Sequence, residues 1–117
     1  MTYAELQRKI KTASAWYLGA FMSEFIDHYY EYCDDKDAKK NFIDYMFKEY
    51  DGCNSYESVR SKCYAIIEII EANKVVDALE YVIASNDKTV IEQAKINAQE
   101  LLDDIKSGKV ELPYAEL

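Results

Sequence analysis

The sequence predicts an all-α protein, a compact bundle of four to five helices with a short extended C-terminal tail. Only three glycines and one proline occur in 117 residues, too few for the turns of a many-stranded sandwich or barrel. Half of the residues are hydrophobic, enough to fill one core and to disfavour intrinsic disorder. Apolar residues recur at steps of three or four, the spacing of a helix face. We therefore expect residues 1–117 to form a single helical domain.

The first predicted helix covers residues 3–33. Thr2 and Glu5 form a capping-box pattern at its start, and apolar positions follow at helical spacing to its end. Between positions 12 and 26 the only charged residue is Glu24, so this part of the helix is apolar on more than one face. Such a helix is buried, either at the centre of the domain or against a partner.

Two short helices and one longer helix are predicted next, at residues 36–50, 55–73 and 75–85. The acidic run at positions 34–37 ends the first helix and supplies an N-cap for the second, and Gly52 is placed to stop it. Asn54 or Ser55 caps the third helix. The pattern leaves open whether Asn73 breaks the chain or only bends it.

The last predicted helix covers residues 88–106, with a capping-box pattern that starts at Thr89 and with Gly108 as its stop. Residues 109–117 then form the extended tail. The tail contains Val110 and Leu112, so it is too apolar for a freely solvated end. We expect it to dock on its own domain, and a second chain is the alternative.

The charge of the chain is unbalanced, with 22 acidic against 14 basic side chains and a formal net charge of −8. Proteins that bind nucleic acid over a broad surface need an excess of lysine and arginine, so we expect no direct nucleic-acid binding. The acidity is concentrated in two blocks, residues 24–57 and 68–104, each with a net charge of −6.

The first acidic block also contains six of the eleven tyrosines. Three of them fall within four consecutive positions, and they cannot all face one core because successive helical residues turn by about 100°. At least one phenol should therefore lie at the surface among carboxylates, where tyrosine is a favoured contact residue. The candidate partner-binding residues are Asp27, Tyr29, Tyr30, Glu31, Tyr32, Asp34, Asp35, Asp37 and Tyr45. The alternative is that these tyrosines are edges of the core and that the acids are a solvated face.

Small side chains form a stripe along the first predicted helix, at positions 12, 15, 19 and 23. Such a stripe lets another helix approach closely. That helix belongs either to the same chain or to a second copy, in a homodimer with Ala15, Gly19, Met22 and Ile26 at a two-fold interface. In the second case a Gly19→Leu variant should be a folded monomer.

His28 is the only histidine, and Glu24, Asp27 and Glu31 lie within one helical turn of it. These groups are the basis for an alternative hypothesis, that the chain is a metal-binding or catalytic helical bundle. Helical carboxylate metal sites use Glu-x-x-His pairs from several helices, and this sequence has no such pair. We therefore expect no enzyme, no metal and no cofactor.

The cysteines Cys33, Cys53 and Cys63 form neither a disulfide framework nor a C-x-x-C pair, and the neighbours of Cys63 indicate that it is buried. Reduced thiols favour a cytoplasmic location. The uncharged run at positions 12–23 is too short to span a membrane and contains polar residues, so we expect neither a signal peptide nor a membrane protein.

The leading hypothesis is a small acidic helical module that binds another protein. An inhibitor or immunity-type protein that covers a basic surface fits this pattern, and the phosphate-binding groove of a nucleic-acid enzyme is a reasonable target. In size and charge, but in no motif, the chain resembles bacterial immunity proteins and phage-encoded inhibitors.

Overall fold

The computed structural model describes residues 1–50, 54–88 and 90–113. Over these ranges the chain forms seven helices and no strand, which confirms the all-α prediction. The helices are α1 (Tyr3–Ala13), α2 (Ala15–Asp27), α3 (Tyr29–Tyr32), α4 (Lys36–Tyr50), α5 (Tyr56–Glu71), α6 (Val75–Ala84) and α7 (Glu92–Lys106). None of them is long and apolar enough to cross a membrane.

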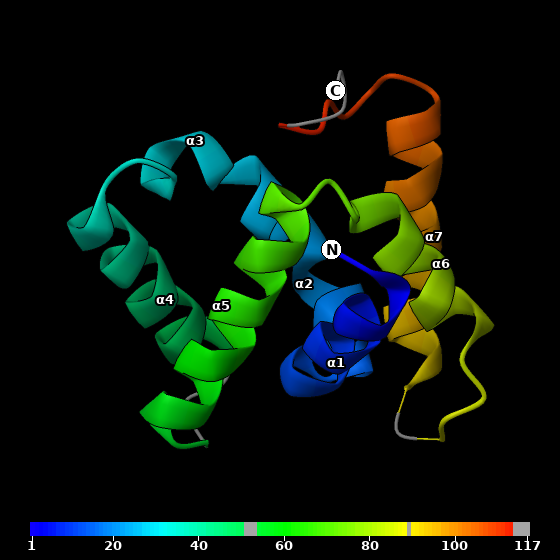
Figure 1. The fold of residues 1–117 in the computed structure, drawn as a ribbon, viewed down its shortest axis with the longest axis horizontal. Helices are drawn as coiled ribbons and strands as arrows, with labels where there is room; N and C mark the ends of the chain where they lie inside the picture. The colour runs from blue at the N-terminus through cyan, green and yellow to red at the C-terminus, as the bar shows by residue number, and fades with distance from the viewer. Residues whose placement is uncertain (51–53, 89, 114–117) are drawn as a thin grey trace.

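Helix α2 runs through the middle of the molecule (Figure 1). It packs against the pair α1 and α5 and also against the pair α6 and α7, whereas α4 packs against α3 and α5 at one edge. Tyr17, Leu18, Met22 and Phe25 of α2 are fully buried. The expectation that the apolar middle of the first predicted helix lies at the centre of the domain is therefore confirmed.

The prediction of a single helix at residues 3–33 is wrong, because the helix is interrupted twice within this range. Ser14 takes a φ angle of 71° between α1 and α2, and His28 (φ −98°, ψ 3°) ends α2. A straight helix of this length would measure about 46 Å, while the longest dimension of the molecule is 34 Å. The breaks let α1 fold back against α5 and let α3 turn towards α4.

Local capping interactions start three of the helices. The Glu5 amide donates to the Thr2 hydroxyl at 3.2 Å, and the Ser58 amide donates to the Ser55 hydroxyl at the same distance. Ser55 rather than Asn54 is therefore the cap of α5. The Asp35 carboxylate accepts a hydrogen bond of 2.8 Å from an amide in the first turn of α4, so the prediction of an N-cap in the acidic run is confirmed.

Residues with positive φ angles also follow the ends of α5 and α7. Asn73 (φ 56°) follows α5, and the hydrogen bonds around it form a Schellman motif, so the chain breaks at this residue. Gly108 (φ 85°) follows α7, as the sequence predicted. Helix α7 begins at Glu92, four residues later than predicted, and the proposed cap Thr89 lies outside the described residues, as does Gly52.

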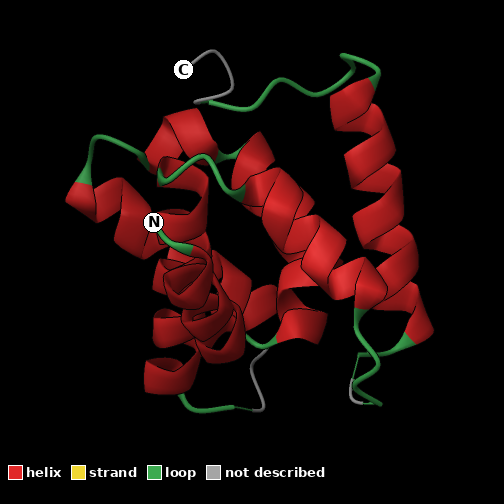
Figure 2. Cartoon of the chain, turned by 45° about the vertical axis from the view of Figure 1, so that its right-hand side comes forward, coloured by secondary structure: helices red, strands yellow, loops and turns green. Residues whose placement is uncertain are grey.

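The tail turns back across one end of the molecule after α7 (Figures 1 and 2). Val110 and Leu112 pack against the core, and the Val110 amide donates to the Asp104 carbonyl at 3.1 Å. As far as residue 113, the tail therefore docks on its own domain, as expected. The remaining four residues lie outside the described part of the chain.

The small-residue stripe packs against other helices of the same chain at Gly19, whereas Ala15 is half-buried and Thr12 and Ser23 are exposed. A Cβ atom on Gly19 would come within 2.8 Å of a Val82 methyl group and within 3.0 Å of the Ala94 carbonyl oxygen, so α2 meets α6 and α7 there. Met22 and Ile26 are also buried in this core. Gly19, Met22 and Ile26 are therefore covered by the core of the same chain, and Ala15 is half-buried against it. A helix of the same chain thus accounts for the close approach, and the two-fold interface stays a prediction.

Candidate functional site at the α3–α4 corner

The corner between α2, α3 and α4 is built around the break at His28. Ending α2 at this residue frees carbonyl groups in the last helical turn, and the buried Tyr32 hydroxyl donates to one of them, that of Phe25, at 2.8 Å. The Tyr32 ring also stacks on Phe42 of α4, with ring centroids 4.7 Å apart. Burial raises the pKa of Tyr32 well above its ordinary value. Tyr32 therefore anchors α3 to both α2 and α4.

The structure divides the nine candidate contact residues into two groups. Tyr29 and Tyr32 are only 2% and 1% exposed, so they belong to the core and their inclusion in a contact surface is corrected. The reason is that the turn after α2 directs both rings inward against each other, and Tyr32 also against Phe42. The other seven lie at the surface: Asp27, Tyr30, Glu31, Asp34, Asp35, Asp37 and Tyr45.

Tyr30 is the most exposed large apolar side chain of the described residues, at 76%. The expectation that at least one phenol of this segment reaches the surface is therefore confirmed. Residues 27–37 contain five carboxylates and one lysine, and all six of these side chains are exposed. We call this surface, made of the seven exposed residues, the acidic corner.

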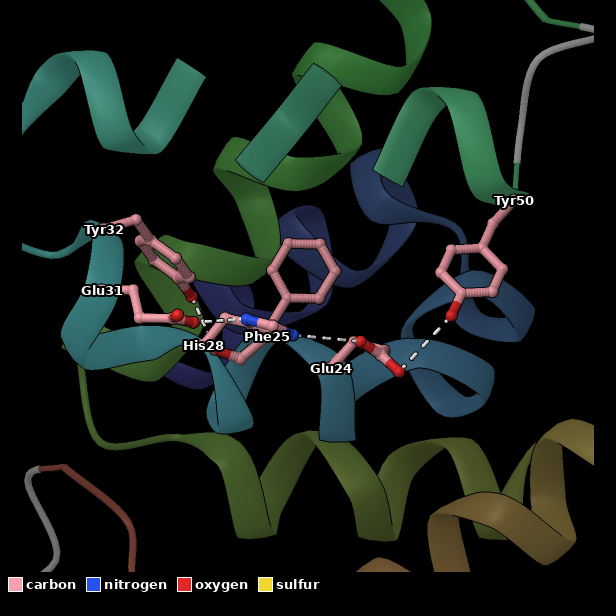
Figure 3. A network of polar contacts seen from close by, with 6 residues as sticks. All are labelled: Glu24, Phe25, His28, Glu31, Tyr32 and Tyr50. Carbon is pink, nitrogen blue, oxygen red and sulfur yellow. Dashed lines mark hydrogen bonds and ion pairs between the residues drawn. The ribbon is translucent and has the colours of Figure 1, made fainter. Parts of the chain in front are cut away.

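His28 lies between two carboxylates (Figure 3). Its Nδ1 atom contacts Glu31 and its Nε2 atom lies 3.5 Å from Glu24. The sequence placed Glu24 and Glu31 within one helical turn of His28, and the structure brings both carboxylates against its imidazole ring although the helix breaks at this residue. Both ring nitrogens are thus occupied by carboxylates, and the described residues contain no group of three or more potential ligands arranged to hold a metal.

Tyr50, at the far end of α4, completes this network and was missed by sequence reasoning. Its hydroxyl donates to Glu24 at 3.4 Å. A hydrogen bond with Tyr45, burial and the nearby Glu24 charge raise the pKa of Tyr50 to about 12. Tyr50 is 26 residues from Glu24 in the sequence, so no local pattern could have identified the pair.

Neither of the two cysteines in the described ranges lies in a setting that would activate it as a nucleophile. Cys63 is fully buried, as predicted, and Cys33 is a half-buried free thiol. Burial and the adjacent Asp34 raise the pKa of Cys33, which disfavours the reactive thiolate. Cys53 lies outside the described residues.

Away from the acidic corner, a hollow of about 640 Å³ lies between the start of α1 and α6. Its lining includes Tyr3, Asp77, Glu80 and Tyr81. Its Asp77 is engaged by Lys74 at 3.6 Å. The acidic corner has the larger set of exposed carboxylates, so we treat it as the candidate site and use the hollow as a control.

Comparisons with protein-family models, with curated proteins and with solved structures find no match to this chain. The class of protein is therefore defined by its own features, an all-helical domain with an acidic, tyrosine-bearing corner. The function has to be argued from the chemistry of that corner.

Proposed function

We propose that this chain is a small acidic module that binds another protein through the acidic corner, as an inhibitor or immunity-type protein that covers a basic surface. The observation that carries the proposal is the exposure of Tyr30, 76%, within a segment of five exposed carboxylates. Exposing an aromatic ring to water is unfavourable, whereas burying it against a partner contributes to binding with little loss of side-chain entropy.

The charge around Tyr30 suits a partner with a concentration of lysine and arginine. Complementary charge speeds the encounter of two proteins and disfavours partners of the wrong sign. A phosphate-binding groove of a nucleic-acid enzyme is the kind of basic surface that we expect. The thiol of Cys33, which the structure places outside a disulfide bond, supports a cytoplasmic setting.

Neutralising the acidic corner tests the proposal. The triple variant Glu31→Gln, Asp34→Asn and Asp35→Asn removes three charges, and asparagine can still cap α4 at position 35. If each exposed charge contributes about 0.5 kcal/mol, affinity for the partner should fall about tenfold. The partner is first captured from an extract of the native host and identified by mass spectrometry, and its affinity for each variant is then measured.

The matched control neutralises three exposed acids elsewhere, in Glu80→Gln, Glu100→Gln and Glu111→Gln. The control variant should keep near-native affinity, and binding by the native chain should weaken as salt is added. A partner that binds equally to both triple variants, with no dependence on salt, would contradict the proposal.

A further inference from the structure

A pocket of about 270 Å³ opens between α3 and α4 beside the acidic corner. Its volume is below the range of about 300–1,000 Å³ that is typical of small-molecule sites. It has room for one side chain of a partner rather than for a whole cofactor. The residues that matter for its chemistry are His28, Glu31, Tyr32, Asn41, Phe42 and Tyr45.

The walls of this pocket are mostly aromatic rings. The His28 ring lies 5.4 Å from Phe42 and 5.9 Å from Tyr45, measured between ring centroids. Phe42 in turn stacks on Tyr32. Tyr45 is 38% exposed and forms the outer edge. Faces of aromatic rings carry partial negative charge and attract cations.

The polar groups of the pocket also favour a cation. Glu31 lines it, and Glu24 contacts the other side of the His28 ring (Figure 3). With both carboxylates ionised, Glu24, Glu31 and His28 together carry a charge of −1 if the imidazole is protonated and −2 if it is neutral.

We propose that this pocket receives an arginine side chain of the basic partner, an inference that rests on the proposed function. A guanidinium group is planar, so it can stack on an aromatic ring such as Tyr45 while its N–H groups face oxygen acceptors. Glu31 and the side-chain amide oxygen of Asn41 are such acceptors in the lining. The ammonium group of lysine can neither stack in this way nor reach several acceptors in one plane.

Two charge-matched peptides test the inference, acetylated and amidated hexa-arginine and hexa-lysine. Their dissociation constants are measured by NMR titration of the ¹⁵N-labelled protein at low ionic strength. We expect hexa-arginine to bind about fivefold more tightly, with shifts at the Asn41 side-chain amide. Tyr45→Leu should remove this preference and Tyr45→Phe should keep it, while circular dichroism checks that both variants are folded.

Tyr3→Leu is the matched control, because Tyr3 is an exposed tyrosine beside acids in the other hollow. It should leave the preference for arginine unchanged. The arginine pocket would be overturned if the native protein bound the two peptides with equal affinity and if Tyr45→Leu changed neither affinity. The proposed function would still stand if the acidic-corner triple variant bound both peptides more weakly than the native protein. If each peptide bound the acidic-corner triple variant as tightly as it bound the control triple variant, and if the two peptides did not differ in affinity, both proposals would be overturned.

Discussion

In the part of the chain that the structure describes, two residues other than glycine hold the backbone at positive φ angles, Ser14 at 71° and Asn73 at 56°. Asn73 lies in the left-handed helical region, which asparagine tolerates better than most residues. The Lys74 amide donates to the Ile69 carbonyl, and the Asn73 amide donates to the Ile70 carbonyl. This motif ends α5 and directs the chain into α6.

Replacing Asn73 by alanine should destabilise the protein by about 1 kcal/mol, because the new Cβ raises the energy of the left-handed conformation. Asn73→Gly has no such penalty and should be at least as stable as the native chain. Urea unfolding of both variants measures the difference. A stability of Asn73→Ala equal to that of Asn73→Gly would contradict this interpretation of the turn.

Asp44 and Tyr56 form a hydrogen bond between α4 and α5. The hydroxyl of Tyr56 donates to the carboxylate and, with the help of Lys40, lowers the pKa of Asp44. The same bond, together with burial, raises the pKa of Tyr56. The Tyr56 ring also packs edge-on against Phe47, with centroids 5.5 Å apart.

The stabilisation from this bond should depend on pH. A carboxylate with a lowered pKa in the folded state stabilises the fold above its unfolded pKa of about 3.9, and this contribution is lost as the pH falls through the lower folded value. Tyr56→Phe should therefore cost about 0.5 kcal/mol at pH 7 and less at pH 3. Urea unfolding at the two pH values tests this, and a gap that does not narrow would contradict it.

At the level of helices, the packing of α2 against α6 and α7 depends on Gly19. The methyl group of Val82 and the backbone of Ala94 lie against the position that a Cβ would occupy. Val82 is fully buried, so it has little space into which it could move. The helices approach this closely only because residue 19 has no side chain.

Gly19→Ala should lower the free energy of unfolding by about 1–3 kcal/mol, because overpacking outweighs the gain in helix propensity. Gly19→Leu should not give a folded monomer, contrary to the expectation from the sequence. Thermal unfolding followed by circular dichroism tests both variants. The control is Ala20→Gly, at a half-buried neighbouring position of the same helix, which should cost about 1 kcal/mol through propensity alone.

Within the described residues, the excess negative charge is accompanied by few ion pairs between residues distant in the sequence. Most of the pairs that the structure describes join neighbours in the sequence, such as Lys40 with Asp44 and Lys74 with Asp77. Lys9 and Glu68 connect α1 to α5. Self-repulsion of a net charge of −8 therefore opposes folding and is only partly compensated.

Salt should consequently stabilise the protein. Raising sodium chloride from about 0.01 to 0.2 M shortens the screening length from about 30 Å to below 10 Å, and we expect Tm to rise by a few degrees. The acidic-corner triple variant reduces the charge from −8 to −5 and should show a smaller rise. Calorimetry measures both, and a Tm that falls with salt would show that local ion pairs dominate.

Much of the fold and part of the candidate site follow from local patterns in the sequence. Helical spacing and the caps at Thr2, the acidic run and Gly108 correctly predicted an all-helical chain and several helix ends. These features depend on residues within one or two turns of each other. The exposure of at least one tyrosine among carboxylates was predictable for the same reason, since three neighbouring tyrosines cannot all face one core.

The tertiary structure alone decided which of these tyrosines are buried and where the first helix breaks. Neither Ser14 nor His28 is a common helix breaker, and each break is stabilised by helices that return from later in the chain. The pocket is likewise formed when α4 brings Phe42 and Tyr45 against His28. The sequence by itself determined the class of fold and the acidic surface, whereas packing between residues distant in the chain shaped the pocket within that surface.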